Sequence, residues 1–115
     1  MRIRRTLGAS ALLAIAAGAQ IPAATALGGA HAARTRTVVL QNIAFHPATL
    51  SIHRGDAVTW MWRDGQTQHN VTGAGFKSRT MTKGSFTVRF SKRGTFNYRC
   101  TIHASFGMRG KIVVR

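Results

Sequence analysis

The chain has 115 residues, a length that suits one domain with one hydrophobic core. Its hydrophobic content of 44% is that of a globular chain and argues against intrinsic disorder. Lysine and arginine number 17 against two acidic residues, for a formal net charge of +15. The basic residues are scattered and accompany no recognition helix or aromatic nucleic-acid motif, so the composition argues against a nucleic-acid-binding protein.

The first 32 residues have the features of a secretory signal peptide. Three arginines lie within residues 2–5, an alanine-rich apolar run covers residues 7–19, and small-residue cleavage sites end at Ala26 and Ala32. A transmembrane anchor is the alternative, but the apolar run is short for a span of about 20 residues. We expect cleavage after Ala26 or Ala32 and export to the periplasm, the cell envelope or the extracellular space. The mature domain is then expected at residues 35–115.

The mature domain would keep a strong positive charge and a single thiol. Loss of the three arginines in residues 2–5 leaves fourteen basic residues against Asp56 and Asp64, a net charge of +12. Such a charge favours contact with an acidic protein or an anionic envelope surface. Because Cys100 is the only cysteine, no internal disulfide can form. Metal ligation would protect this thiol in an oxidising compartment and would stabilise a small core.

Apolar residues repeat with a period of two along the mature chain, in residues 50–53, 58–63, 86–90 and 112–114. In the second of these runs, Trp60 and Trp62 share a face with Val58 and are predicted to lie in the core. Glycine- and aspartate-containing turns separate the runs. Short strands with such turns predict an all-β domain, an antiparallel sandwich or barrel.

A further predicted strand leads to the cysteine. Alternation places Phe96, Tyr98 and Cys100 on one face, and the two aromatic residues require that face to point into the core. The sulfur of Cys100 is therefore expected to point inward at the end of this strand.

Four potential metal ligands stand in a recognisable order around that cysteine. Cys100, His103 and Met108 follow one another in the segment CTIHASFGM, and His69 lies upstream after a predicted strand and turn. A thiolate, two imidazoles and a thioether suit copper, whereas zinc rarely takes methionine and calcium takes oxygen. Two histidines and a cysteine with a weak axial methionine are the ligands of a type 1 electron-transfer copper site.

The sequence resembles the plastocyanin and amicyanin branch of the cupredoxins. The resemblance lies in residues 95–114, TFNYRCTIHASFGMRGKIVV, in residues 47–64, PATLSIHRGDAVTWMWRD, and in His69-Asn70-Val71. It implies a small antiparallel Greek-key β-sandwich with one copper ion held by His69, Cys100, His103 and Met108. It also implies that Asn70 joins the two ligand loops. Gln68 and Ile102 stand where the family often has proline before the ligating histidines.

The function that the resemblance implies is single-electron transport between redox proteins. We expect a monomer, and its positive charge predicts partners with acidic docking surfaces. A copper storage or delivery protein of the cell envelope is the alternative, but such proteins favour methionine- or histidine-rich tracts. An enzyme is not expected. Copper enzymes with this kind of site usually carry His-Cys-His and need further copper, whereas Arg99 and Thr101 flank Cys100 here.

Overall fold

β-Strands make up nearly all the regular structure of the described residues, 31–115, in this computed structural model. The strands are β1 (Thr35–Leu40), β2 (Phe45–His46), β3 (Thr49–Ile52), β4 (Ala57–Arg63), β5 (Thr72–Gly73), β6 (Phe76–Lys77), β7 (Lys83–Arg89), β8 (Gly94–Arg99) and β9 (Arg109–Val114). A 3₁₀ helix, Ala104–Phe106, precedes β9. In this part of the chain we find no helix of the length and apolarity that a membrane span requires. The predicted signal peptide lies outside the described residues, except for its last two.

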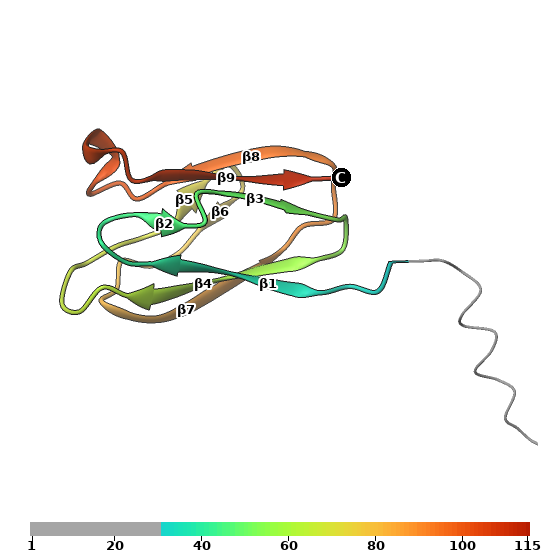
Figure 1. The fold of residues 1–115 in the computed structure, drawn as a ribbon. Helices are drawn as coiled ribbons and strands as arrows, with labels where there is room; N and C mark the ends of the chain where they lie inside the picture. The colour runs from blue at the N-terminus through green and yellow to red at the C-terminus, as the bar shows by residue number, and fades with distance from the viewer. Residues whose placement is uncertain (1–30) are drawn as a thin grey trace, which may run out of the picture. The chain divides into compact units, whose positions relative to one another are not determined.

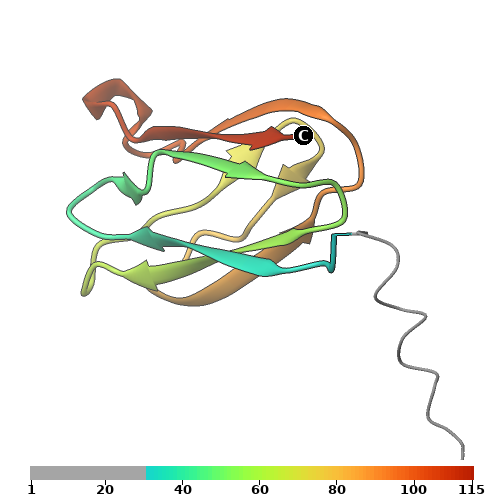
Figure 2. The same ribbon diagram turned by 45° about the vertical axis from the view of Figure 1, so that its right-hand side comes forward.

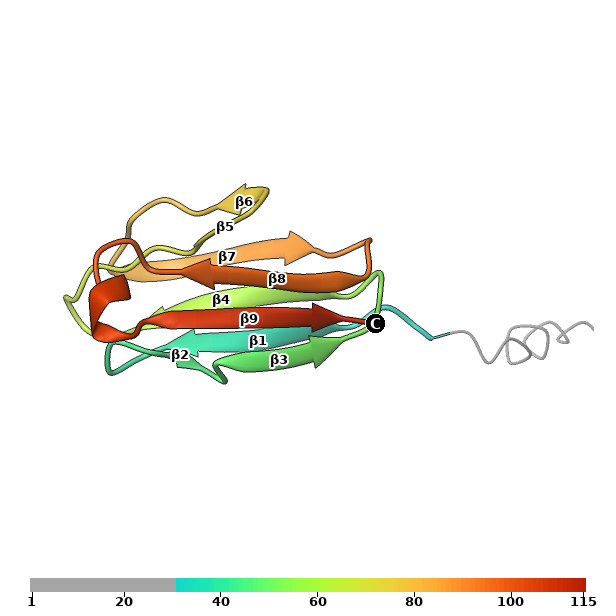
Figure 3. The same cartoon turned by 90° about the horizontal axis from the view of Figure 1, so that it is seen from above.

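The strands form two sheets that stack face to face (Figure 1). One sheet has the order β2-β1-β4-β7, and the other has the order β3-β9-β8-β5-β6. Figure 3 shows the second sheet lying over the first, with the long strands of the two sheets nearly aligned. The β-sandwich predicted from the alternating pattern is confirmed.

Both sheets are mixed, which differs from the purely antiparallel arrangement expected from the sequence. β1 pairs with β4 in parallel, and β3 pairs with β9 in parallel, while the other strand pairs are antiparallel. Parallel neighbours need a connection that crosses over, and here the chain crosses between the two sheets. After β1 and β2 it runs through β3 in the opposite sheet and returns as β4 beside β1.

The core fills the space between the sheets with the residues that the alternating pattern predicted. Val58, Trp60 and Trp62 of β4 are buried, while the residues between them are half-buried. Trp60 lies at the centre of the aromatic cluster. Its ring centroid is 5.2 Å from that of Tyr98, at right angles, and 5.7 Å from that of Phe76. Figure 2 shows that the connections following β1, β4 and β8 gather at one end of this sandwich.

Two buried polar groups of this core, on Tyr98 and Trp60, have incomplete hydrogen bonding. The hydroxyl of Tyr98 and the indole N–H of Trp60 are buried and, within residues 31–115, lack a well-formed hydrogen bond. The Tyr98 ring lies against Gly110 on the paired strand, where a Cβ would stand 2.5 Å from the hydroxyl. Burial raises the pKa of Tyr98 to about 12, a rise that the nearby Trp60 indole partly offsets.

This raised pKa predicts a loss of stability at alkaline pH. Between pH 10 and 12 the unfolded chain releases the Tyr98 proton while the folded chain keeps it, so stability falls as the pH rises. The loss should be about 2–3 kcal/mol at pH 12. Tyr98→Phe removes this loss. Urea unfolding of both proteins should show their free energies of unfolding diverging above pH 10, and parallel pH profiles would contradict this account.

Candidate metal centre

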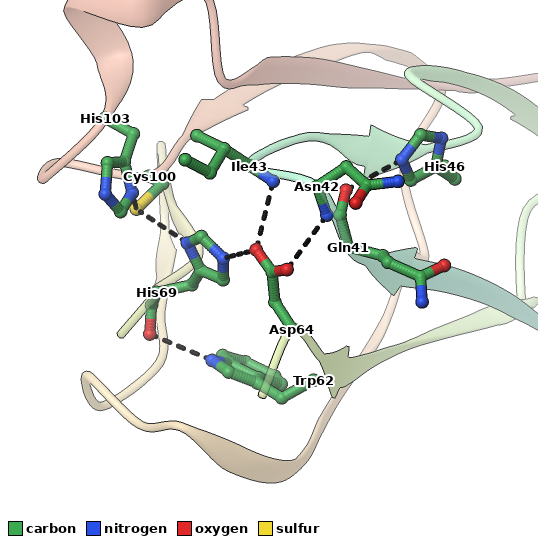
Figure 4. Close-up of polar contacts among 9 residues, drawn as sticks. All are labelled: Gln41, Asn42, Ile43, His46, Trp62, Asp64, His69, Cys100 and His103. Atoms are coloured by element: carbon green, nitrogen blue, oxygen red, sulfur yellow. Dashed lines mark hydrogen bonds and ion pairs between the residues drawn. The ribbon is translucent and has the colours of Figure 1, made fainter. Parts of the chain in front are cut away.

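Three of the four predicted ligands meet at the end of the sandwich where the connections gather (Figure 4). The Sγ of Cys100 lies 3.8 Å from Nδ1 of His69 and 3.6 Å from Nδ1 of His103. The three donor atoms lie within 4.8 Å of one another. His69 and Cys100 are fully buried, whereas His103 is half-buried. A metal ion bound here would therefore be shielded from water except on the His103 side.

The ligand loop is folded back by its own backbone. Cys100 follows β8, and its N–H donates to the carbonyl of Met108 at 3.1 Å. The N–H of Met108 in turn donates to the carbonyl of His103 at 3.2 Å. Gly107 closes the 3₁₀ helix with a φ of 90°, a conformation that suits glycine. The loop thus brings Cys100, His103 and Met108 to one place, and the side chain of Met108 is fully buried.

His69 reaches the cluster from a separate part of the fold. Its backbone pairs with Met81, with two N–H···O hydrogen bonds of 2.9 Å, and its carbonyl accepts the indole N–H of Trp62 at 2.9 Å. These bonds fix the backbone of His69 against strand β4. His46 and His53 are both exposed.

Asn70 ties the loop that carries His69 to the ligand loop, as the family resemblance implied. Its side-chain amide donates to the hydroxyl of Thr101 at 2.8 Å, and its side-chain oxygen accepts the N–H of Thr101 at 3.0 Å. The same amide donates to the hydroxyl of Thr80 at 3.0 Å. Because Thr101 follows Cys100 directly, these bonds set the position of the cysteine relative to His69.

Asp64 is the site residue that the sequence did not reveal. The pair Asp64-Gly65 has the composition of a turn, yet Oδ2 of Asp64 accepts a hydrogen bond from Nε2 of His69 at 2.7 Å. The carboxylate also accepts the N–H groups of Asn42 and Ile43, both at 3.0 Å. Desolvation alone would raise the pKa of Asp64. The bonds from His69, Ile43 and Asn42 outweigh it and hold the pKa below its usual value. Its place five residues before His69 was the available signal.

The donor set fits copper. Two imidazole rings and the sulfur of Cys100 lie together in a largely buried place, and the thioether of Met108 is buried in the same loop. These are borderline and soft ligands, which bind copper in preference to calcium or magnesium. The ligands come from rigidly hydrogen-bonded segments, as a site with a fixed geometry requires.

Comparison with known proteins agrees with this reading. The family model described as copper binding proteins, plastocyanin/azurin family, matches residues 33–115. Chloroplastic plastocyanin of Tetradesmus obliquus is 31% identical over 87 residues, which cover 64% of this chain and 59% of that protein. Halocyanin of Natronomonas pharaonis is 33% identical over 78 residues, which cover 62% of this chain and 48% of that protein. The matched region thus spans about half the length of these curated relatives.

Solved structures extend the similarity to the fold. An oxidised amicyanin mutant has a TM-score of 0.63 and 32% identity, over 70% of this chain and 81% of that one. A Cu(I) form of another amicyanin mutant has a TM-score of 0.64 and 30% identity, over 76% of this chain and 88% of that one. The chain belongs to the plastocyanin/azurin family of copper-binding proteins.

Proposed function

We propose that the domain carries one electron at a time on a single type 1 copper ion, held by His69, Cys100, His103 and Met108. The observation that carries this proposal is the convergence of Nδ1 of His69, Sγ of Cys100 and Nδ1 of His103 at one end of the sandwich. Ligands fixed by the surrounding hydrogen bonds need little rearrangement between the two copper states, which favours fast electron transfer. No catalytic reaction forms part of the proposal.

The half-buried edge of His103 is the proposed exit for the electron. Three large apolar side chains are exposed in the described part of the chain, and all three belong to the loops at this end: Ile43, Ile102 and Phe106. Phe106 is 76% exposed, and its ring centroid lies 6.2 Å from that of His103. Exposed apolar side chains grouped in this way are typical of a protein-binding surface. We propose that redox partners dock here and that the protein acts as a monomer.

A row of basic residues crosses the five-stranded sheet beside this surface. Arg99 of β8 pairs directly with Arg109 of β9, and Thr72 of β5 links Arg99 to Lys77 of β6. All three basic residues are exposed. Like charges directly opposite one another destabilise a sheet. The only two carboxylate side chains in the sequence, Asp56 and Asp64, are bound elsewhere. Acidic groups on a redox partner would relieve this repulsion.

The basic row predicts a local effect on the rate of electron transfer. Arg99→Ser with Arg109→Ser should slow oxidation of the Cu(I) protein by the anion ferricyanide about tenfold at low ionic strength. The rate should also depend less on salt. Lys92→Ser with Arg93→Ser is the matched control, because it removes two exposed charges from the turn between β7 and β8. Equal effects of the two double variants in stopped-flow measurements would show that only net charge matters.

We further propose that the protein acts outside the cytoplasm, in the periplasm or cell envelope. The signal-like residues 1–32 and the use of the single cysteine as a metal ligand support this location.

A potentiometric titration of the copper-loaded protein tests the proposed electron-carrier function. An electron carrier takes up one electron per chain reversibly and keeps its copper in both states, whereas a storage or delivery protein need not cycle reversibly between Cu(II) and Cu(I).

A further inference from the structure

Asp64 and Cys100 lie on opposite sides of the His69 ring (Figure 4). Nε2 of His69 is 2.7 Å from Oδ2 of Asp64, and Nδ1 of the same ring is 3.8 Å from Sγ of Cys100. The His69 side chain is fully buried, while the Asp64 side chain is 16% exposed. The His69 ring therefore lies between the metal-binding cluster and the Asp64 carboxylate. Among the described residues, no other carboxylate contacts this ring.

This arrangement determines which ring nitrogen carries the proton. A neutral imidazole has one N–H and one nitrogen with a free lone pair. The ionised carboxylate of Asp64 can only accept, so Nε2 must carry the proton and donate it. Nδ1 is then left with its lone pair directed at the cluster, which is the form that binds a metal.

The β1–β2 connection holds the carboxylate in place. Asn42 and Ile43 both adopt positive φ angles, 54° and 53°, which are unusual for residues other than glycine. This conformation directs their two backbone N–H groups at Asp64, one at each carboxylate oxygen. Consecutive strained residues persist only where the surrounding structure stabilises them, and here the Asp64 carboxylate does so.

The charge of Asp64 also distinguishes the site from the rest of the protein. The sequence contains two acidic residues, and the other one, Asp56, accepts the backbone N–H groups of Arg34 and His53. Those residues adjoin the start of β1 and the end of β3, at the end of the sandwich away from the cluster. In a chain of strongly positive charge, Asp64 is thus the acidic residue whose side chain contacts a predicted metal ligand.

We propose that Asp64 is a positioning residue that fixes the metal-binding tautomer of His69 and whose charge stabilises Cu(II) relative to Cu(I). The second part rests on the proposed electron-carrier function, and the first does not. Cu(II) with one thiolate carries a net positive charge, whereas Cu(I) with one thiolate is neutral. A fixed carboxylate separated from the metal by one ring therefore favours the oxidised state.

Asp64→Asn tests both parts, because the side chain keeps its shape but loses its charge. Its single oxygen cannot accept all three donors. We expect the Cu(II)/Cu(I) ratio at a fixed applied potential to fall about tenfold, which raises the reduction potential by about 59 mV. Asp56→Asn makes the same change at the other end of the sandwich and should shift the potential far less. Equal shifts in the two variants, or none in Asp64→Asn, would overturn the charge assignment.

The ring proton of His69 tests the positioning role without any electron transfer. In the diamagnetic Cu(I) protein, or with Zn(II) as a redox-silent probe, ¹H–¹⁵N spectra should show a strongly deshielded Nε2–H that exchanges slowly with water. In Asp64→Asn this proton should move upfield and exchange at least about tenfold faster. A wild-type His69 that is protonated at Nδ1, or a slow signal that survives in the variant, would overturn the tautomer assignment. Should the variant fail to fold, the wild-type spectrum alone decides this point. Failure of the electron-carrier proposal would leave the Zn(II) spectra readable.

Discussion

Replacement of Cys100 by serine should abolish the intense visible absorption of the copper-loaded protein. The absorption arises from charge transfer between a thiolate sulfur and Cu(II), and a hydroxyl group is neither soft nor anionic at neutral pH. Copper affinity should fall by more than about 100-fold, since loss of an outer-sphere partner alone can cost about that much. Absorption spectra and competition with a chelator measure the two effects.

Ser105→Ala is the matched control for this experiment. Ser105 is exposed and lies in the same ligand loop, within the 3₁₀ helix, but it contributes no predicted ligand. We expect its spectrum and copper affinity to equal those of the wild type. A Cys100→Ser protein that kept the blue absorption would show that another group supplies the charge transfer.

Substitutions of Met108 should shift the reduction potential in opposite directions. A thioether binds Cu(II) weakly, so the better oxygen donor in Met108→Gln stabilises Cu(II) and lowers the potential. Met108→Leu removes the axial donor and raises it. Each shift should be at least about 59 mV, a tenfold change in the Cu(II)/Cu(I) ratio, and copper should stay bound by the remaining three ligands.

Met61→Leu provides the control for the methionine series. Met61 is half-buried in β4, where it alternates with the core residues Trp60 and Trp62 and faces away from them. Its replacement should leave the potential unchanged. Cyclic voltammetry of the four proteins decides the question, and unchanged potentials in both Met108 variants would place the axial ligand elsewhere.

The sequence predicted the elements whose side chains alternate clearly. In β4 and β8 every second residue enters the core, so the pattern alone placed Trp60, Tyr98 and Cys100 inside the sandwich. The short strands β2, β5 and β6 have two residues each, too few for a period to appear. The parallel pairing of β1 with β4 also escaped prediction, because it depends on how the chain crosses between sheets and not on any local pattern.

The site was predicted unevenly for a similar reason. The spacing of Cys100, His103 and Met108 is local, since one loop carries all three, and it could be read directly from the sequence. The role of Asp64 depends on the β1–β2 connection, 21 and 22 residues away, whose N–H groups hold the carboxylate. No short-range pattern records such a contact. An aspartate followed by glycine has the composition of a turn, and only the fold shows what its side chain binds.

The most direct test of the electron-carrier account is a copper titration of the purified protein followed by visible absorption. We predict that one copper ion binds per chain, that the Cu(II) form is intensely blue, and that ascorbate bleaches it while copper stays bound. Reoxidation should restore the full colour. A stoichiometry other than one, a pale Cu(II) form, or release of copper on reduction would contradict a single type 1 electron-transfer site.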